Sequence, residues 1–373
     1  MAAVADTSVL APRTHLRNLA IADLEGVLAG AGAPNPALLA RRLAVALHRE
    51  GAASADEAGL GRRVRGWLAS RFDLEPLLEV ADRREAPDGT VQHLFRTRDG
   101  HVFEVVRLKN LKNRTLCLSS QVGCALACTF CATGTLGLAR NLTAGEILES
   151  FSRAARDDDE RVGDVVFMGQ GEPLHNYDEV LLACDNLAHR DGPAISKRRI
   201  TVSTSGLVPA IRRFTAEARP WRLHLSLHSA IDETRRALMP VARTYGLDEL
   251  LAAFREHQRI RQVKWLTFQY VAIPDVNMDE AHIEALDERL QGLRVILNVI
   301  PWNDTGGTPY RAPTWTEVKE FTTALRRLGR PVKTRYSGGK QEGMGCGQLA
   351  GGVLPRRPTG GHVIAPPGIF SDL

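Results

Sequence analysis

The stretch TLCLSSQVGCALACTFC, residues 115–131, joins a β-rich run to a dense group of cysteines. Four of the six cysteines in the chain lie within it, at Cys117, Cys124, Cys128 and Cys131. The first residues of the chain lack the basic stretch and apolar core of a secretory signal, so we expect a cytoplasmic protein with reduced thiols. A dense group of thiols in such a protein favours metal binding or redox chemistry over structural disulfides.

The spacing of the last three cysteines narrows the kind of site. Cys124, Cys128 and Cys131 follow the pattern C-x3-C-x2-C, with Phe130 before the last cysteine. Zinc sites usually combine C-x2-C pairs and close with four ligands, whereas iron–sulfur clusters normally bind four thiolates. Three close thiolates would hold a [4Fe–4S] cluster by three corners and leave one iron open. The alternatives are a zinc site or a chance grouping of cysteines.

Short β-rich runs alternate with helical patterns through most of the chain after residue 113. One helical pattern starts with a capping box at Thr143 and Glu146. Alternating strands and helices predict a parallel sheet, and six such units are too few for a closed eight-stranded barrel. We therefore expect an α/β fold with a partial (βα)6 barrel and one extra strand. The β-rich runs are 115–121, 162–169, 198–205, 222–229, 264–273, 294–302 and 331–337.

The remaining parts of the chain have different patterns. Residues 1–75 alternate apolar and basic positions at helical spacing and predict a small helical accessory domain. Within residues 76–112, two β-rich runs joined by Arg-Asp-Gly predict a hairpin that leads into the core at residues 113–350. Residues 351–373 are rich in glycine and proline and are interpreted as a tail.

Composition excludes some classes of protein. The chain has 373 residues, 44% of them hydrophobic and 24% charged, and no apolar run approaches the ~18 residues of a membrane-spanning helix. We expect a globular protein of two or three domains with no membrane partner. The formal net charge of +5 permits a polyanionic partner without requiring one.

Polar side chains gather where the predicted parallel strands end, the edge at which such sheets bind ligands. Within 222–229, leucines alternate with polar residues, so the polar ones share one face. Glu172 follows another strand in a glycine-rich turn that would let the backbone approach a ligand. Each residue alone is more often an ordinary core group, but together they predict a polar pocket. Its other members are Ser203, Ser205, His224, Ser226, His228 and Asn303.

These motifs together resemble the RlmN/Cfr family of radical S-adenosylmethionine enzymes, which methylate adenosine in RNA. The resemblance is carried by TLCLSSQVGCALACTFC, FMGQGEPLHNYDEV, SKRRITVSTSGLVPAI, LSLHSAIDETRRALMPV, VILNVIPWN and CGQLAG. It implies that Cys124, Cys128 and Cys131 bind one [4Fe–4S] cluster. It also places cofactor contacts at Gly171, Glu172, Ser203, Ser226, Leu227, His228 and Asn303.

The resemblance further implies a covalent mechanism. Cys346 would receive a methyl group from one S-adenosylmethionine, and a second would generate the radical that joins this methyl carbon to the base. Glu104 would remove the ring proton, and Cys117 would then attack the sulfur of Cys346, releasing the product and leaving a disulfide. Cys184, on a helical pattern, is interpreted as a core residue.

The implied substrate is C2 or C8 of an adenosine in 23S ribosomal RNA, transfer RNA or both, with flavodoxin or ferredoxin as the electron donor. A flipped base in single-stranded or loop RNA suits this chemistry, and Lys109, Lys112 and Arg114 are expected to meet phosphates. Two alternatives stay open. The same mechanism could serve another RNA or a small molecule, or the chain could be a non-catalytic iron–sulfur or zinc-bearing RNA-binding protein.

Three departures from the family pattern concern the substrate side. The usual MGMGEP is MGQGEP here, with Gln170 at the altered position. The loop before Cys346 is SGGKQEGMG, residues 337–345, where the family has an acidic loop ending in Ala-Ala. In FQYV, this chain has Gln269 at the position where the family usually has an acid. We therefore expect an intact cofactor site beside a diverged substrate site.

Overall fold

The computed structural model describes residues 13–52, 58–109, 114–157 and 160–349. Its centre is a ten-stranded sheet in the order β1-β2-β3-β4-β7-β8-β9-β10-β11-β12. Every neighbouring pair from β4 to β12 is parallel, which confirms the predicted partial barrel with an extra strand. These strands are β4 (Arg114–Leu118), β7 (Val162–Phe167), β8 (Ile200–Thr204), β9 (Arg222–Ser226), β10 (Leu266–Ala272), β11 (Val295–Pro301) and β12 (Val332–Thr334).

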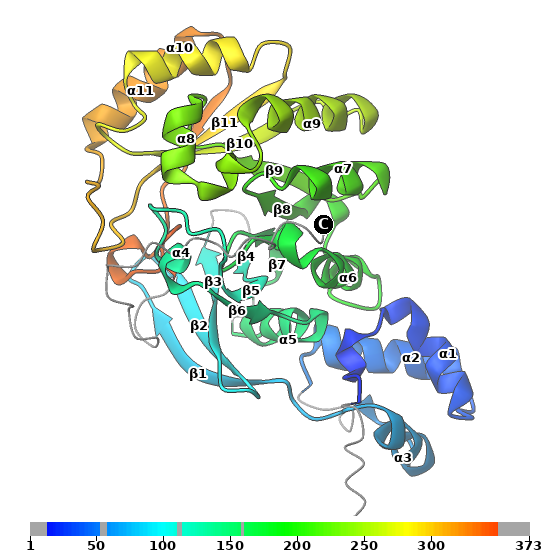
Figure 1. The fold of residues 1–373 in the computed structure, drawn as a ribbon. Coiled ribbons are helices and arrows are strands. Elements are labelled where there is room, and N and C mark those ends of the chain that lie inside the picture. Colours follow the sequence, from blue (N-terminus) through cyan, green and yellow to red (C-terminus); the bar gives the residue numbers. More distant parts are fainter. Residues whose placement is uncertain (1–12, 53–57, 110–113, 158–159, 350–373) are drawn as a thin grey trace, which may run out of the picture.

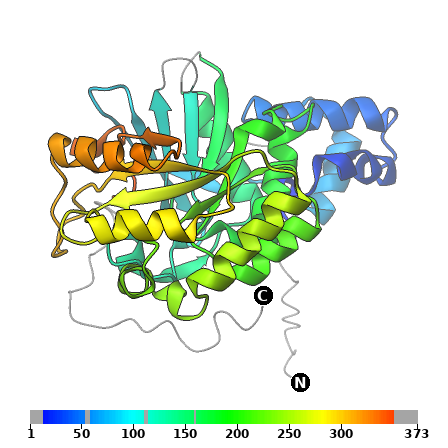
Figure 2. The same cartoon turned by 90° about the horizontal axis from the view of Figure 1, so that it is seen from above.

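Helices cover the outer side of this sheet in both views (Figures 1 and 2). Their apolar faces pack on buried strand residues such as Phe167, Leu225 and Phe268, which form one continuous core. The predicted capping box is present at the start of α5, where Thr143 and Glu146 bond reciprocally. The helices are α5 (Ala144–Ala155), α6 (Tyr177–Ala188), α7 (Val208–Ala216), α8 (Asp232–Leu238), α9 (Leu247–Ile260), α10 (Glu280–Arg289) and α11 (Trp315–Arg327).

An antiparallel extension precedes the barrel. The predicted hairpin is present as β2 (Val91–Thr97) and β3 (Val102–Lys109), and β3 pairs with β4. A third strand, β1 (Leu78–Glu85), lies at the sheet edge and was not predicted. Its sequence, LEVADRRE, is dominated by charged residues that face solvent, so it lacks the apolar alternation of a half-buried strand.

A smaller sheet lies beside the cysteine motif and was also not predicted. It pairs β5 (Gln121–Gly123) with β6 (Leu138–Asn141), and the short helix α4 (Ala132–Leu136) lies between them in sequence. The strands are too short for a periodic pattern to show in the sequence.

The N-terminal helices α1 (Leu24–Gly30), α2 (Pro36–Ala44) and α3 (Arg62–Arg71) pack around a hydrophobic core of their own. They lie at the opposite end of the molecule from α11 in both views (Figures 1 and 2). Within the described ranges, no helix is both long and apolar enough to cross a membrane.

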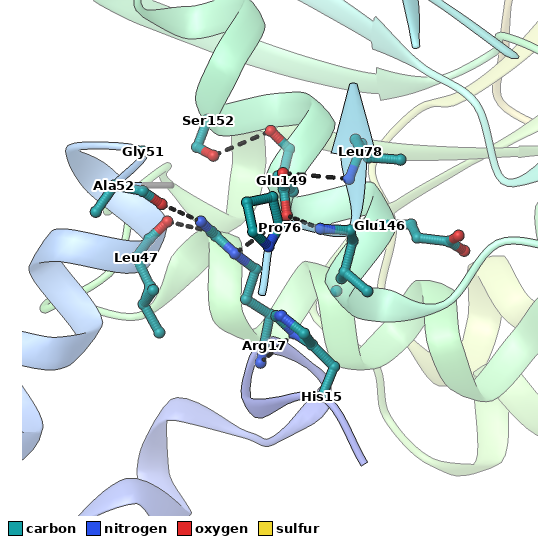
Figure 3. A network of polar contacts seen from close by, with 12 residues as sticks. His15, Arg17, Leu47, Gly51, Ala52, Pro76, Leu78, Glu146, Glu149 and Ser152 are labelled. Atoms are coloured by element: carbon teal, nitrogen blue, oxygen red, sulfur yellow. Dashed lines mark hydrogen bonds and ion pairs between the residues drawn. The ribbon is translucent and has the colours of Figure 1, made fainter. Parts of the chain in front are cut away.

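A buried ion pair joins these helices to the barrel (Figure 3). The Arg17 guanidinium lies 3.5 Å from the carboxylate of Glu149 on α5, and both side chains are almost fully buried. Arg17 also donates to the main-chain oxygens of Leu47 and Ala52, while Glu149 accepts from the main-chain N–H groups of Leu77 and Leu78. Glu149 also pairs with Arg153 at 2.7 Å, so its buried carboxylate compensates two guanidinium groups.

Candidate active site

The cysteine motif forms a tight loop between β5 and α4. At Gly123, with φ of +77°, a Cβ atom would lie 1.9 Å from the main-chain oxygen of Gly137. The N–H of Cys124 donates to that same oxygen at 2.9 Å. At Gly134 a Cβ atom would come within 2.7 Å of the main-chain oxygen of Cys128. Side chains at these two glycines would therefore push the loop open.

The thiols of Cys124, Cys128 and Cys131 line one cavity of about 160 Å³ at the carboxyl ends of the parallel strands. The strand-end residues predicted for this place lie here as well, except His224 and Asn303. Those that line the cavity are Glu172, Ser203, Ser205, Ser226 and His228, together with Gly171. We call this the cysteine cavity.

Burial dominates the electrostatics of the three thiols. It raises the pKa of Cys124 to about 12, and the pKa values of Cys128 and Cys131 also lie above the usual thiol value. Arg235 opposes this rise at Cys128, but burial dominates, so the thiols are neutral at physiological pH. No group of three or more His, Cys, Asp or Glu side chains in the described part of the chain is arranged to hold a single metal ion.

Glu172 is held firmly at the wall of the cysteine cavity. Its carboxylate accepts hydrogen bonds from the main-chain N–H of Leu174 at 3.1 Å and that of Ser205 at 2.8 Å. Its own N–H donates to the side chain of Gln121 at 2.9 Å. Burial raises the pKa of Glu172, and these hydrogen bonds oppose that rise. The bonds fix the carboxylate in one orientation toward the cavity.

His228 closes another wall of the cysteine cavity and is neutral. Its backbone is left-handed, with φ of 58°, a conformation uncommon outside glycine. Its Nδ1 accepts a 3.0 Å hydrogen bond from the N–H of Val271. Its ring packs edge-to-face with Phe130, with 4.9 Å between the ring centroids. Burial lowers the pKa of His228 to about 3. The ring therefore acts as an apolar and hydrogen-bonding wall rather than as a charge.

A second cavity of about 310 Å³ contains Cys117. Cys346 lines this cavity and the cysteine cavity alike, so it lies at the boundary between them. Burial raises the pKa of Cys117 to about 12, the nearby Cys346 adds to the rise, and Arg335 opposes it. We call this second space the Cys117 cavity.

Hydrogen bonds from three parts of the chain hold the segment around Cys346. Its N–H donates to Ser337 Oγ at 3.3 Å, and its main-chain oxygen accepts from Asn303 at 3.0 Å. The main-chain oxygen of the next residue, Gly347, accepts from the N–H of Ala132 at 2.7 Å. Cys346 is thus fastened to the helix that directly follows Cys131.

Glu104 lies on β3, on the strand face that also carries Val106 and Leu108. Those two residues line the Cys117 cavity. Glu104 comes earlier on the strand, is buried and does not line this cavity. Its carboxylate accepts a 3.1 Å hydrogen bond from Gln92 on β2. Burial raises the pKa of Glu104 to about 7, against the smaller opposing effect of the Gln92 bond. A carboxyl with this pKa exchanges a proton near neutral pH.

Some predicted site residues lie outside both cavity walls. Leu227 packs in the core, and its N–H donates to the main-chain oxygen of Gln269 at 3.0 Å. Asn303 holds the Cys346 segment instead of lining the cysteine cavity. Cys184 is fully buried in the core of the sheet and helices, as expected.

Gln269 corrects our interpretation of the departures from the family pattern. We expected the substitution at this position to lie on the substrate side. Gln269 instead lines the cysteine cavity, because it pairs with Ser226, the residue at which β9 ends. It donates to His224 Nδ1 at 3.1 Å and accepts from Asn298.

The three basic residues expected at the entrance have different positions. Lys109 lines the Cys117 cavity. Arg114 is buried and pairs with Glu160 at 3.0 Å, so its expected role as an accessible phosphate contact is wrong. Lys112 lies outside the described residues. Sequence reasoning missed Arg335 and Tyr336, which line the Cys117 cavity directly after β12.

Comparisons with known proteins identify the family. The family pattern of the radical SAM superfamily matches residues 118–286. A probable RNA methyltransferase of Myxococcus xanthus is 41% identical, over 92% of this chain and 98% of that protein. The dual-specificity RNA methyltransferase RlmN of Anaeromyxobacter sp. (strain Fw109-5) is 42% identical, over 93% and 94%.

A solved structure is also similar over nearly its whole length. The crystal structure of a radical SAM methyltransferase from Sphaerobacter thermophilus has a TM-score of 0.84 and 38% sequence identity, covering 90% of this chain and 99% of that one. High identity over almost the full length of several relatives extends the match well beyond the barrel. This chain is an enzyme and belongs to the RlmN-like family of radical SAM RNA methyltransferases.

Proposed function

We propose that this enzyme methylates carbon C2 or C8 of an adenosine in RNA, with 23S ribosomal RNA, transfer RNA or both as substrates, in the cytoplasm. The observation that carries the proposal is the position of Cys346, which lines the cysteine cavity on one side and the Cys117 cavity on the other. A residue that carries a methyl group from one reactant to another has to be accessible from both.

The residues of the cysteine cavity fit a [4Fe–4S] cluster and S-adenosylmethionine. Cys124, Cys128 and Cys131 would hold the cluster, since their three thiols line one cavity and an iron–sulfur cluster would favour their thiolate forms. Glu172 would accept the ammonium group of S-adenosylmethionine, and Gly171, Ser203, Ser226 and His228 would complete its binding site. When bound, the pair would supply a one-electron cleavage of S-adenosylmethionine and a carbon-centred radical.

Three residues of this chain would then act on the methyl group and the base. Cys346 Sγ carries the methyl carbon and becomes bonded through it to the adenine ring. Glu104 removes the proton from the methylated ring carbon, for which a pKa near 7 is suited. Cys117 would lose its thiol proton and its Sγ would attack Cys346 Sγ, so that an S–S bond forms and the S–C bond breaks. The electron pair of the S–C bond leaves with the methyl carbon, which takes up a proton, and the methylated base is released.

The Cys117 cavity supports a nucleobase as the methyl acceptor. Lys109 and Arg335 line it together with Cys117 and Cys346, and these two cations would face the phosphates of an extruded nucleotide. The two-cavity arrangement supports a catalytic role over a non-catalytic RNA-binding protein, because a binder needs no thiol pair across a boundary. Flavodoxin or ferredoxin is the proposed electron donor.

Mass spectrometry of cellular RNA tests this function. Digests of 23S ribosomal RNA and of transfer RNA from cells with and without the gene would be compared for 2-methyladenosine and 8-methyladenosine. We expect one of them to vanish with the gene and to return with the wild-type gene but not with Cys346→Ala. Identical levels of both nucleosides in all strains would refute the proposal.

A further inference from the structure

A third cavity, of about 350 Å³, lies next to the Cys117 cavity, and the mechanism above makes no use of it. Tyr336 and Ser337 line both cavities, so the two spaces share this part of the chain as a wall. The far wall is formed by Trp302, Pro313 and Trp315. We call this space the Trp315 cavity.

Two of its aromatic side chains are exposed to an extent that is unusual for large rings. Trp315 is 65% exposed and Tyr336 is 53% exposed. Large aromatic residues normally bury most of their surface, and exposed groups of them mark binding surfaces. An exposed aromatic ring on a firm support can stack against any nucleobase.

Trp315 is held in place by its local structure. It is the first residue of α11, directly after Thr314, which closes a capping box with Glu317. Glu317 in turn accepts two hydrogen bonds from Arg311 at 3.1 and 2.6 Å. These bonds fix the start of the helix, so the indole is presented without a loop having to become ordered first.

The charges around the cavity suit a polyanion on balance. Lys319 Nζ lies 4.9 Å from the centre of the Trp315 ring, and Lys340 lines the cavity. Asp304 also lines it, with its carboxylate accepting from the N–H of Gly306 at 2.8 Å. Arg335, one residue before Tyr336, adds a positive charge on the side of the Cys117 cavity.

We propose that the Trp315 cavity binds the base of the nucleotide that adjoins the target adenosine, by stacking on Trp315 and Tyr336. This inference rests on the proposed function, since it takes RNA as the substrate. A target base in the Cys117 cavity places its neighbour along the strand at the wall formed by Tyr336. The neighbouring base then becomes a determinant of which adenosine the enzyme accepts.

RNA binding by the reconstituted enzyme tests the proposal. The probe is a fluorescein-labelled, unmodified hairpin RNA with one adenosine in its loop, alongside versions with an abasic residue on either side of that adenosine. Trp315→Ala should raise the Kd for the intact hairpin about tenfold, as expected for loss of one stacked base. Trp315→Phe, which keeps an aromatic ring, should recover most of the affinity.

Trp265 supplies a matched control, since it is 41% exposed and lines neither the Trp315 cavity nor the Cys117 cavity. Trp265→Ala should bind the hairpin like the wild type. One of the two abasic hairpins should bind wild type about tenfold more weakly than the intact hairpin, and Trp315→Ala should bind that abasic hairpin no more weakly than wild type does. This loss of additivity identifies the partner of Trp315 as the base itself.

Several results would overturn the inference. If Trp315→Ala binds the intact hairpin as tightly as wild type, the cavity is no base site, although RNA remains a substrate. If Trp315→Ala binds both abasic hairpins about tenfold more weakly than wild type does, as it does the intact hairpin, Trp315 does not contact a neighbouring base. Failure of the wild type to bind any hairpin would count against RNA as the substrate and so against both proposals. Shielding of Trp315 from acrylamide without RNA would mean that another occupant, such as a second copy, covers the site.

Discussion

The side-chain amide of Asn303 donates a 3.0 Å hydrogen bond to the main-chain oxygen of Cys346. The same amide donates to Ser337 Oγ at 2.9 Å, and Ser337 accepts from the N–H of Cys346. The end of β11 and the loop after β12 therefore hold Cys346 jointly. Asn303 acts in this arrangement as a positioning residue for the proposed methyl carrier.

The iron and sulfide content of variants should distinguish the three cysteines of the motif, which are proposed cluster ligands, from Cys117, which is not. Anaerobically reconstituted wild type should contain about four irons and four sulfides per chain, as one cluster requires. Cys128→Ala should lose most of this iron, because one of three proposed ligands is missing. Cys117→Ala should keep it, since Cys117 lies in the other cavity. Iron and sulfide analysis measures both, and zinc without iron in the wild type would exclude the cluster.

Glu172→Gln should weaken binding of S-adenosylmethionine at least tenfold. The substitution removes the negative charge proposed to face the ammonium group, and a hydrogen bond to a charged group contributes about 1.5–3 kcal/mol. Calorimetry under anaerobic conditions measures the affinity. Asp178→Asn is the matched control, because Asp178 is exposed at the start of α6 and should leave the affinity unchanged. Unchanged affinity in Glu172→Gln would mean that the carboxylate serves only the turn.

The covalent mechanism predicts that variants of Cys117 and Cys346 differ in whether they accumulate a protein–RNA adduct. In Cys117→Ala, the methyl carbon on Cys346 can join the base, but no thiol resolves the link. The enzyme should accumulate attached to RNA and appear on a denaturing gel as a shifted, nuclease-sensitive band. Cys346→Ala and the double variant should show no such band. Full turnover by Cys117→Ala would remove Cys117 from the mechanism.

Glu104 should make stability depend on pH. Its pKa is about 7 in the folded protein, above the usual 4.5, so the folded state binds the proton more tightly than the unfolded state. The free energy of unfolding should therefore fall as pH rises from about 4.5 to 7, by up to ~3 kcal/mol, and this contribution should be constant above that range.

Glu104→Gln, which cannot ionise, should lack this fall, so its stability relative to wild type should grow across the same range. Anaerobic urea unfolding at several pH values measures the difference. Glu79→Gln, at an exposed position on β1, should run parallel to wild type. Parallel curves for Glu104→Gln as well would show that its carboxyl is already ionised in this range.

The parts of the molecule that could be predicted from sequence are those set by local patterns. Strand-and-helix alternation predicted the parallel strands β4 and β7 to β12, and the capping box at Thr143 predicted the start of α5. The charged strand β1 has no such pattern, because an edge strand buries little of its surface.

The contents of the site depended on contacts distant in sequence. Arg114 looked like an accessible cation in the sequence, but the fold pairs it with Glu160. Gln269 lines the cysteine cavity because it pairs with the last residue of β9. Tyr336 carried no motif, and its place between two cavities follows from the position of the last strand.

The Arg17–Glu149 contact has a consequence for the order of assembly during synthesis. The carboxylate of Glu149 receives the guanidinium from the N-terminal helices and the N–H groups at the start of β1. Its helix, α5, leaves the ribosome more than a hundred residues after Arg17. Arg17 therefore cannot form its ion pair until Glu149 has been synthesised. The N-terminal helices can pack against the barrel in their final position only after the first strand–helix unit of the barrel has emerged.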